Sequence, residues 1–565
     1  MRPSQVVMRP EDLGGAWATR HSFARALIRR AVAEGWRATC TRADLDGDGR
    51  GVVVFEVGVG EHMWSFVAFS QTIADVDRED RVVAQSWDVT AALVDGEVDD
   101  QDVAGLRSEV TRQEGGRADE RTLIWTRANR SARFFDDVVR RLADGRQPDP
   151  DAFGLSPYLL RSTAFYSNGK FGLADFERFE EGHPLAIPYR PHMLAAWLLR
   201  ELGYVLVEHC AAARSDRAVR LGGEWRRYLG LGNATGLGLV PYVVNHPEVL
   251  DAWIRLRERP LSEVVARHVD RNEPDVARVR SLLERAIRCL AEQGHAEPEP
   301  YSSGAALAAR LGQIRELLVE YSEHGTMCGA VELRPWRRLH ETASAIGPEV
   351  RGVVASILVE LTGHLDETVE LGLRCHEERT VRPRMRCGEL LEMIDERYAW
   401  LAQFDVTDAA QTARFWFSSA NNEEPRRAYA GVDPGESVQL AVDVVRAVHA
   451  LRADLTSVDA AMSVAEFLIA RPGHRGAVTR VQAVGDLEYA ELHANLLSDD
   501  FVPLHVQRLQ LAVYGMGNFN PQSTDWLRVT LFSGAPRIAE LADGTADDDW
   551  SFTPRPAVPG ERTSR

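Results

Sequence analysis

The chain has 565 residues, of which 45% are hydrophobic and 27% are charged. This length and composition exclude a single small module and a mainly disordered chain, because enough apolar surface is available for a large core. Acidic residues number 84 and Lys plus Arg number 66, so the net charge of -18 opposes non-specific binding to nucleic acid or anionic lipid. We therefore expect no nucleic-acid partner and no membrane partner.

The six cysteines are sparse and irregularly spaced, which fits neither a disulfide framework nor a paired zinc site. Residues 1–12 lack the apolar core of a signal peptide, and no stretch reaches the roughly 18 apolar residues of a membrane span. These features predict a soluble protein of the reducing cytoplasm.

The N-terminal part begins with a helical pattern at 21–34. Two runs rich in β-branched and aromatic residues follow at 52–57 and 63–69, and the short glycine-containing stretch between them predicts a β-hairpin. We expect a third strand at 81–91, with helices at 102–112 and 132–144 covering one face of this small sheet. The Pro-, Gly- and Asp-rich stretch 144–151 is typical of a linker, so residues 1–148 are interpreted as an α+β domain.

Residues 149–460 form a helical core domain in this interpretation, because apolar residues recur three and four positions apart. Several of these helices carry apolar residues over a broad face, which favours packing on two sides or a homo-oligomer. The expected helices lie at 193–214, 248–257, 275–293, 305–321, 350–371 and 437–454.

Residues 461–541 are expected to form a C-terminal α+β segment packed on the core, and residues 542–565 a flexible tail. Three apolar runs predict strands, and two Gly- or Asn-containing stretches predict turns. The strands are expected at 477–484, 508–514 and 526–532, and the turns at 515–518 and 520–523. The predicted fold class is thus α+β, with a mainly helical core, a small antiparallel sheet in the N-terminal domain and a few strands near the C-terminus.

Lys170 is the single lysine of the chain, so the other 65 basic residues are arginine. It lies between Gly169 and Phe171 in a polar stretch that contains Asn168 and is expected to form an irregular loop. An arginine cannot replace an amine that must lose its proton, which makes Lys170 a candidate nucleophile or general base. The alternative is a solvated lysine at an exposed turn.

A glycine-rich segment, 230–238, combines four closely spaced glycines with Asn233 and Thr235, and Asn245 and His246 follow shortly after it. Exposed backbone N–H groups of such a segment can bind a phosphate or carboxylate. The spacing matches neither a P-loop nor the G-x-G-x-x-G fingerprint, and no clear βαβ unit surrounds it. The alternative is a tight helix–helix crossing that needs small residues.

A third cluster, 414–429, leads from aromatic residues into two amides, Glu423, Glu424 and two arginines, a composition typical of a polar ligand pocket. Its alternative is a helix end followed by a salt-bridged loop. His324 and Cys328 have the spacing of two ligands on one helical face, but Gly325 predicts that the helix ends between them. We therefore expect no metal site.

The leading hypothesis is a cytosolic enzyme that acts on a small carboxylate or phosphate metabolite by lyase or proton-transfer chemistry. Lys170 would be the amine nucleophile or base, and Glu423 or Glu424 with His246 would be partner acid–base groups. The expected substrate-binding residues are Arg161, Asn168, Arg226, Arg227, Gly232, Asn233, Thr235 and Asn245.

Two other functions fit the same sequence. One is a non-catalytic oligomeric ligand-binding or assembly protein, in which the glycine segment serves packing. The other is an enzyme with a flavin- or CoA-type cofactor on the glycine segment 230–238. The sequence names neither the substrate nor a cofactor.

Overall fold

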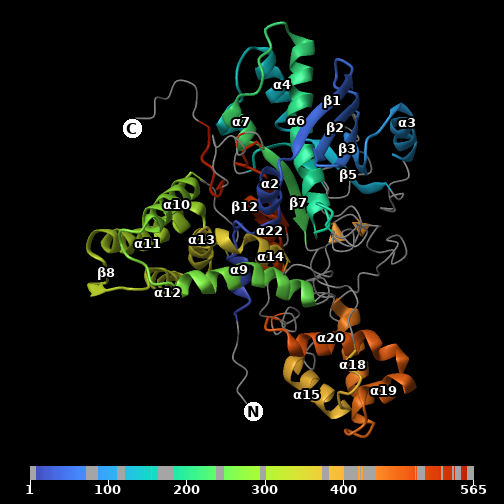
Figure 1. Ribbon diagram of the computed structural model, residues 1–565, viewed down its shortest axis with the longest axis vertical. Helices are drawn as coiled ribbons and strands as arrows, with labels where there is room; N and C mark the ends of the chain where they lie inside the picture. The colour runs from blue at the N-terminus through green and yellow to red at the C-terminus, as the bar shows by residue number, and fades with distance from the viewer. Residues whose placement is uncertain are drawn as a thin grey trace.

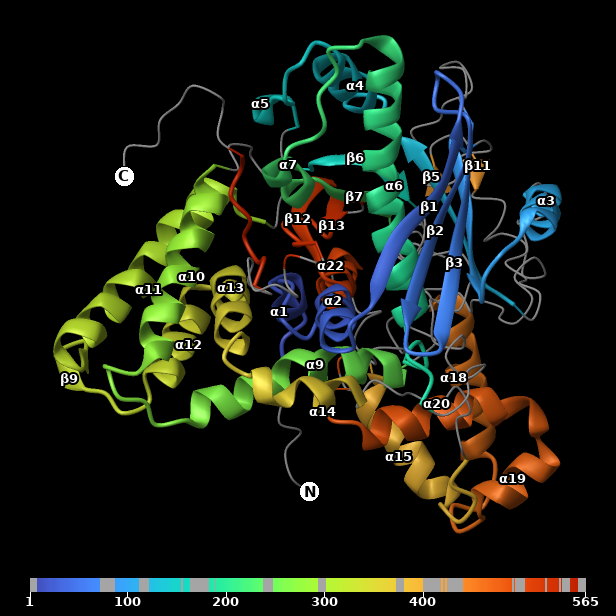
Figure 2. The same cartoon turned by 45° about the horizontal axis from the view of Figure 1, so that its top comes forward.

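The structure is a computed structural model. It describes residues 8–71, 87–110, 121–153, 156–162, 182–187, 189–236, 247–292, 301–371, 381–399, 418–419, 422–423, 441–489, 492, 503–523, 526–537, 540 and 549–556. A central sheet with helices packed around it is visible in Figure 1 and, turned by 45°, in Figure 2.

Among the described residues, one nine-stranded sheet has the order β1-β2-β3-β4-β5-β6-β7-β13-β12. Every neighbouring pair in it is antiparallel except β6 and β7, which are parallel. Its strands are β1 (Arg37–Leu45), β2 (Gly51–Val59), β3 (His62–Ser70), β4 (Val89–Asp95), β5 (Thr122–Arg130), β6 (Tyr158–Ser162), β7 (Gly230–Gly236), β12 (Met516–Ser523) and β13 (Trp526–Leu531).

This sheet corrects the expected fold class, because it is large and mixed rather than small and antiparallel. The described part of the chain contains two further sheets of two strands each, β8 (Thr326–Met327) with β9 (Ala330–Val331) and β10 (Ser418–Ser419) with β11 (Asn422–Glu423). The prediction failed because β7 and β12 are rich in glycine, asparagine or proline, which normally disfavour strands. Their conformation depends on neighbouring strands that are distant in sequence.

The β2–β3 hairpin is confirmed, with Val57 opposite Trp64 and Val59 opposite His62. Gly60, in the turn, has φ +58°, a left-handed conformation that glycine adopts at little cost. The β-branched runs are apolar without strict alternation because both faces of the hairpin are buried. The core covers one face, and α3 (Asp100–Glu109) covers the other through a cluster that includes Val52 and Leu106.

The chain from β6 to β7 forms a βαβ unit, which the sequence analysis did not find. β6 is followed by α6 (Arg190–Arg214) and α7 (Gly223–Tyr228), and the chain then returns as β7, parallel to β6. α6 packs closely on β6 at Gly203, where an added Cβ would contact the Leu159 and Leu160 side chains. α9 (Pro247–Ala266) is the next described helix after β7.

The expected helices around 193–214, 248–257, 275–293, 305–321 and 437–454 are all present, and 350–371 is divided into two helices and a 3₁₀ turn. The two runs expected to be strands at 477–484 and 508–514 are instead helical, which overturns that prediction. No helix in the described ranges has the length and apolar character that crossing a bilayer requires. The remaining helices are α1 (Glu11–Gly14), α2 (Phe23–Ala33), α4 (Phe135–Ala143), α5 (Pro150–Phe153), α10 (Pro274–Ala291), α11 (Gly304–His324), α12 (Pro335–Ile346), α13 (Pro348–Val359), α14 (Asp366–Leu371), α15 (Cys387–Arg397), α18 (Ala441–Thr456), α19 (Val464–Ala470), α20 (Arg475–Asp486) and α22 (Pro503–Tyr514).

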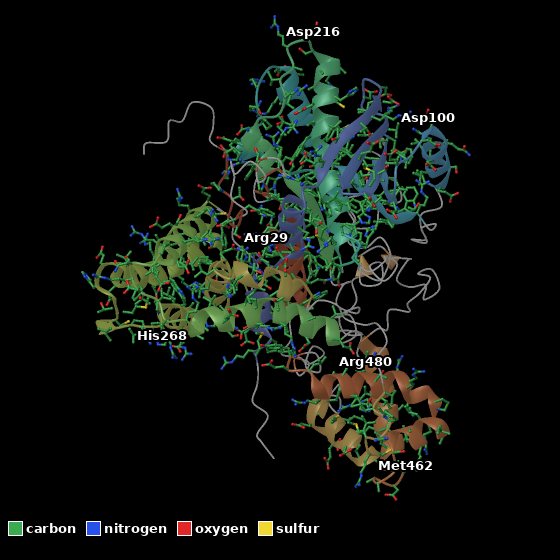
Figure 3. The ribbon with its side chains drawn as sticks, in the orientation of Figure 1. Arg29, Asp100, Asp216, His268, Met462 and Arg480 are labelled. Atoms are coloured by element: carbon green, nitrogen blue, oxygen red, sulfur yellow. The ribbon has the colours of Figure 1, made fainter. Side chains whose placement is uncertain are left out.

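The helices form two peripheral groups beside the sheet. α10 to α13 lie together on one side, and α15, α18, α19 and α20 form the other group in both views (Figures 1 and 2). Asp100, Asp216 and His268 lie toward the outside in Figure 3, whereas Arg29 lies near the middle of the molecule. The Arg29 side chain, on α2, is only 16% exposed.

Candidate functional site

The carboxyl ends of β6 and β7 lie at the same edge of the sheet, because the two strands are parallel neighbours. β6 ends at Ser162, and Lys170 follows eight residues later in sequence, outside the described residues. β7 ends at Gly236, and the next described residue is Pro247, which His246 directly precedes. The carboxyl ends of adjacent parallel strands are the usual place for a ligand in such units. The segments that contain Lys170 and His246 therefore both begin at this edge of the sheet.

The N-terminus of α6 points toward the same edge. At its middle, Arg200 Nε and the Tyr204 hydroxyl donate to the Leu229 carbonyl at 3.0 and 2.6 Å, and Leu229 directly precedes β7. The first turn of the helix is about 15 Å further along its axis, toward the end where β7 finishes. The helix dipole favours an anion there, although the Arg190 N–H already donates to the Ile187 carbonyl and Pro191 has no N–H.

Arg190, the first residue of α6, adds a guanidinium that is 5% exposed and donates to the Pro184 carbonyl. Arg161 on β6 is partly buried and lies opposite Asn129 and Gly232 in the ladder. Both cations thus belong to the elements that meet at this edge.

Asn233 is 2% exposed, and its Nδ2 has no hydrogen-bond partner within the part of the chain that the structure describes. A buried amide without a partner is costly, so such a group indicates a water or a ligand. Asn233 is opposite Val529 in the ladder with β13, and Thr235 is opposite Leu527. Of the expected binding residues, Asn233 is the one whose described environment best fits ligand contact.

Gly230 and Gly232, the first two glycines of the segment 230–238, have a packing role in β7. A Cβ on Gly232 would overlap the Tyr158 ring, and one on Gly230 would overlap the Leu531 carbonyl. Gly230 and Gly232 pair with β6 on one side and residues 231–236 pair with β13 on the other, so these backbone groups face strands rather than an open loop. The close approach of neighbouring strands explains the glycines without a ligand.

The other predicted residues are separated from this edge or lie outside the description. Arg226 and Arg227 precede β7, and their guanidiniums pair with Glu208 and Glu540. Glu423 is described only as part of the short strand β11. Asn168, Lys170, Asn245, His246 and Glu424 lie outside the described residues.

Histidine and aromatic rings also gather at this edge, which is where β3 begins. The His183 ring lies 4.8 Å from the His62 ring and 5.7 Å from the Trp64 ring. His183 Nδ1 accepts a hydrogen bond from the Leu185 N–H at 3.1 Å, so its proton resides on Nε2. His183 is close in sequence to Lys170, but its proximity to β3 could not be deduced from the sequence.

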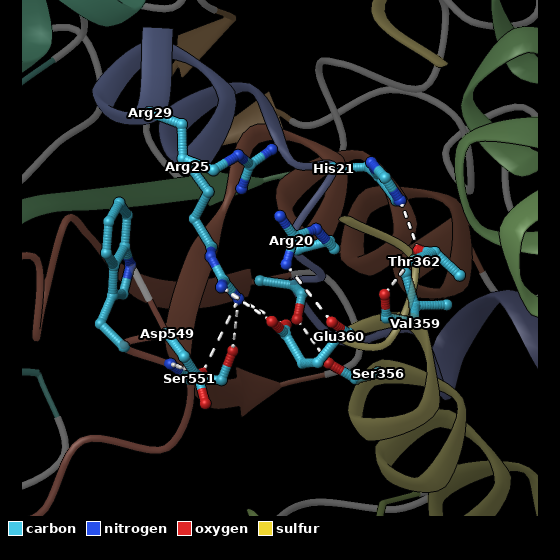
Figure 4. A network of polar contacts seen from close by, with 12 residues as sticks. Arg20, His21, Arg25, Arg29, Ser356, Val359, Glu360, Thr362, Asp549 and Ser551 are labelled. Carbon is cyan, nitrogen blue, oxygen red and sulfur yellow. Dashed lines mark hydrogen bonds and ion pairs between the residues drawn. The ribbon is translucent and has the colours of Figure 1, made fainter. Parts of the chain in front are cut away.

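A second polar cluster lies between α2 and the end of α13 (Figure 4). Arg25 donates to both Glu360 oxygens at 2.5 and 2.8 Å, with side chains that are 2% and 1% exposed. Burial raises the pKa of Glu360 although Arg25 acts in the opposite direction. Arg25 also donates to Ser551 at 3.0 Å, so residues 549–556, within the stretch expected to be a tail, dock against the core.

Asp366 is the second acidic centre of this cluster. It accepts two hydrogen bonds from Arg20 at 2.9 and 2.6 Å, and Arg29 lies 3.2 Å away. Burial opposes its ionisation, but the Arg20 hydrogen bonds and the charge of Arg29 together lower its pKa. These ion pairs connect α2 and the residues just before it to the start of α14.

His21 lies between Thr362 and Asp366, with Nε2 2.8 Å from Thr362 Oγ1 and Nδ1 3.3 Å from Asp366 Oδ1. The order acid, histidine, hydroxyl resembles that of a catalytic triad, but Thr362 is 0% exposed and donates to the Val359 carbonyl at 2.6 Å. Burial lowers the pKa of His21 to about 3 despite the opposing charge of Asp366. We therefore interpret the cluster as structural.

A cavity of about 20 Å³ beside this cluster is lined by His21, Ser22, Trp17, Trp253 and Arg257, among others. Its volume is sufficient for a water molecule but not for a metabolite. Ser22 Oγ and Trp17 Nε1 have no hydrogen-bond partner within the described part of the chain, which suits a buried water.

The described residues contain no group of three or more metal-binding side chains. α11 ends at His324, where Gly325 has φ +71°, so His324 and Cys328 do not share a helical face. Comparisons of the whole chain with protein-family models, curated proteins and solved structures find no match.

Proposed function

We propose that the protein is an enzyme that binds a small anionic metabolite at the carboxyl end of the β6–β7 pair, with Lys170 as its amine nucleophile or general base. The observation that carries the proposal is the parallel pairing, since it brings the starting points of the Lys170 and His246 segments to one sheet edge. The buried Asn233 amide at this end of the sheet provides a donor for the ligand.

A carboxylate or phosphate ligand is supported by the charges that meet there. The N-terminus of α6, Arg190 and Arg161 all favour negative charge. Arg226 and Arg227 are left out of the proposed site because they precede β7 and so lie at the other end of that strand. The proposed ligand-binding residues are therefore Arg161, Asn168, Asn233, Thr235 and Asn245.

Two reaction types fit an amine in this setting. As a nucleophile, the neutral Lys170 amine would add to a carbonyl carbon of the substrate and release water, leaving a Schiff base. As a base, it would take a proton from carbon, and His246 or a glutamate of the 423–424 pair would return one to the product. Both require that the ammonium lose its proton near neutral pH, which desolvation beside cations promotes.

The test combines ligand screening with chemical trapping on the full chain. Thermal unfolding with 2-oxo acids, hydroxy acids and phosphorylated metabolites should identify a stabilising anion, and Asn233→Leu should reduce that stabilisation. Borohydride added with a stabilising 2-oxo acid should leave a reduced adduct at Lys170, detected by peptide mass spectrometry.

The two reaction types give different outcomes in this test. A reduced adduct at Lys170 supports its role as nucleophile. Its role as base is supported if the protein turns over substrate without forming an adduct and Lys170→Arg abolishes that turnover. An absence of any stabilising anion, or full turnover by Lys170→Arg, would contradict the proposal. Arg280→Gln, which removes a half-exposed cation on α10, outside the proposed site, serves as the charge control.

The non-catalytic assembly protein is supported by one observation. Val331 and Leu333 are 78% and 61% exposed near the β8–β9 hairpin, which is unusual for large apolar side chains so close together. Sedimentation of the full chain and of a Val331→Ser/Leu333→Ser variant tests this function, since only an assembly surface predicts dissociation of the variant.

A further inference from the structure

Arg508, in the middle of α22, is a buried cation without an acidic partner among the described residues. Its side chain is among the largest fully buried ones, with 1% exposure. None of the ion pairs among the described residues includes it, and neither its Nε nor its Nη1 has a hydrogen-bond partner there. Arg25, which is also 1% exposed, is by contrast paired with a carboxylate. Arg508 is thus an exception that needs a physical explanation.

Three aromatic rings surround the guanidinium. The Cζ atom of Arg508 lies 4.5 Å from the Tyr301 ring centroid, 4.9 Å from that of Phe519 and 5.0 Å from that of Trp17. Ring faces attract the positive charge but do not replace oxygen acceptors for its N–H groups. The rings therefore hold the cation in place and leave its strongest hydrogen-bonding capacity unused.

One further polar side chain of the interior, His505, lies beside this cage. His505 is one turn before Arg508 and packs edge-on against Tyr301, with 6.3 Å between the rings. Burial and the charge of Arg508 lower the pKa of His505 to about 4, so the histidine adds no second positive charge at neutral pH.

We propose that Arg508 and the rings of Trp17, Tyr301 and Phe519 form a binding site for a small carboxylate. A single guanidinium matches the charge and the flat, two-oxygen shape of a monocarboxylate, which accepts two parallel N–H bonds. A phosphate dianion fits less well, because no second unpaired cation is described beside the cage. The three rings suit an apolar group attached to the carboxylate. This site shares no residue with the proposed active site.

The test measures thermal unfolding of the full chain in sodium acetate and in sodium phosphate of equal ionic strength. We expect acetate to raise Tm in a saturable way and by more than phosphate does. A ligand at 100 times its Kd should raise Tm by about 2 °C in a chain of this length. Arg508→Met, which keeps the length of the side chain and removes the charge, should lose that acetate-specific rise.

Arg508→Lys and Arg280→Met complete the set. Arg508→Lys keeps the charge but lacks the two-donor geometry of a guanidinium, so the acetate concentration at half-saturation should increase at least about tenfold. This variant tests the proposal independently if Arg508→Met fails to fold. Arg280→Met should respond as the natural chain does. Equal responses to acetate and phosphate, or an unchanged acetate response in both Arg508 variants, would show that Arg508 is only a structural cation and overturn the proposal.

Discussion

The buried Arg25–Glu360 pair allows a quantitative prediction of stability. Glu360→Gln keeps the size of the side chain but leaves Arg25, 2% exposed, without its carboxylate. Breaking a buried ion pair from one side costs about 3 to 5 kcal/mol, because one charge remains buried and uncompensated. Ser551 at 3.0 Å and Asp549 at 4.0 Å still face Arg25, so we expect a loss near the lower limit, about 3 kcal/mol.

The assay is urea unfolding monitored by tryptophan fluorescence, with the free energy of unfolding extrapolated to water. Glu284→Gln is the matched control, since it breaks an exposed pair with Arg280 in which both side chains are about half exposed. That change should cost only about 0.3 to 0.5 kcal/mol. The double variant Arg25→Met/Glu360→Leu should recover much of the loss, because no unpaired charge remains. A loss for Glu360→Gln no larger than that of the control would refute the reasoning.

Two further predictions concern acid stability and the β7 glycines. His21 has a pKa of about 3 in the folded chain and an ordinary value of 6.5 when unfolded, so its contribution is complete above pH 6.5 and decreases as the pH falls toward 3. Between pH 6.5 and 4.5 the loss amounts to about 2 kcal/mol, and His21→Gln should flatten the pH dependence of the unfolding free energy by that amount. An unchanged slope in the variant would contradict the burial argument. Gly232→Ala should cost about 1 to 3 kcal/mol in urea unfolding because its Cβ overlaps the Tyr158 ring. Gly312→Ala on α11, where a Cβ meets no atom within 4 Å, should instead stabilise by about 0.5 to 1 kcal/mol, and a similar effect at both positions would count against the packing interpretation.

Local sequence patterns were sufficient for the elements whose partners are near in sequence. The β2–β3 hairpin and the long helix α6 follow from β-branched runs and from three-to-four spacing, and both are confirmed. The runs within α20 and α22 were mistaken for strands because short apolar stretches rich in valine and leucine fit either conformation. Packing against neighbouring elements determines whether such a run forms a helix or a strand.

The contacts between distant segments could not be predicted from one sequence. β7 has poor strand propensity, and its place between β6 and β13 depends on partners far away in the chain. The same limit applies to Arg508, since nothing in its neighbourhood in sequence distinguishes it from the many solvated arginines. Lys170 and Asn233 could be singled out by residue type, but only the parallel pairing relates their segments to one edge.

The most direct measurement of the central claim is the ionisation of Lys170 itself. Because the chain has one lysine, competitive labelling with acetic anhydride over a range of pH, read by peptide mass spectrometry, reports one side-chain amine. We predict half-maximal reactivity well below the ordinary lysine pKa of about 10.4, with protection by a stabilising anion. An amine that titrates near that ordinary value and is labelled equally with and without the anion would contradict its role as nucleophile or base.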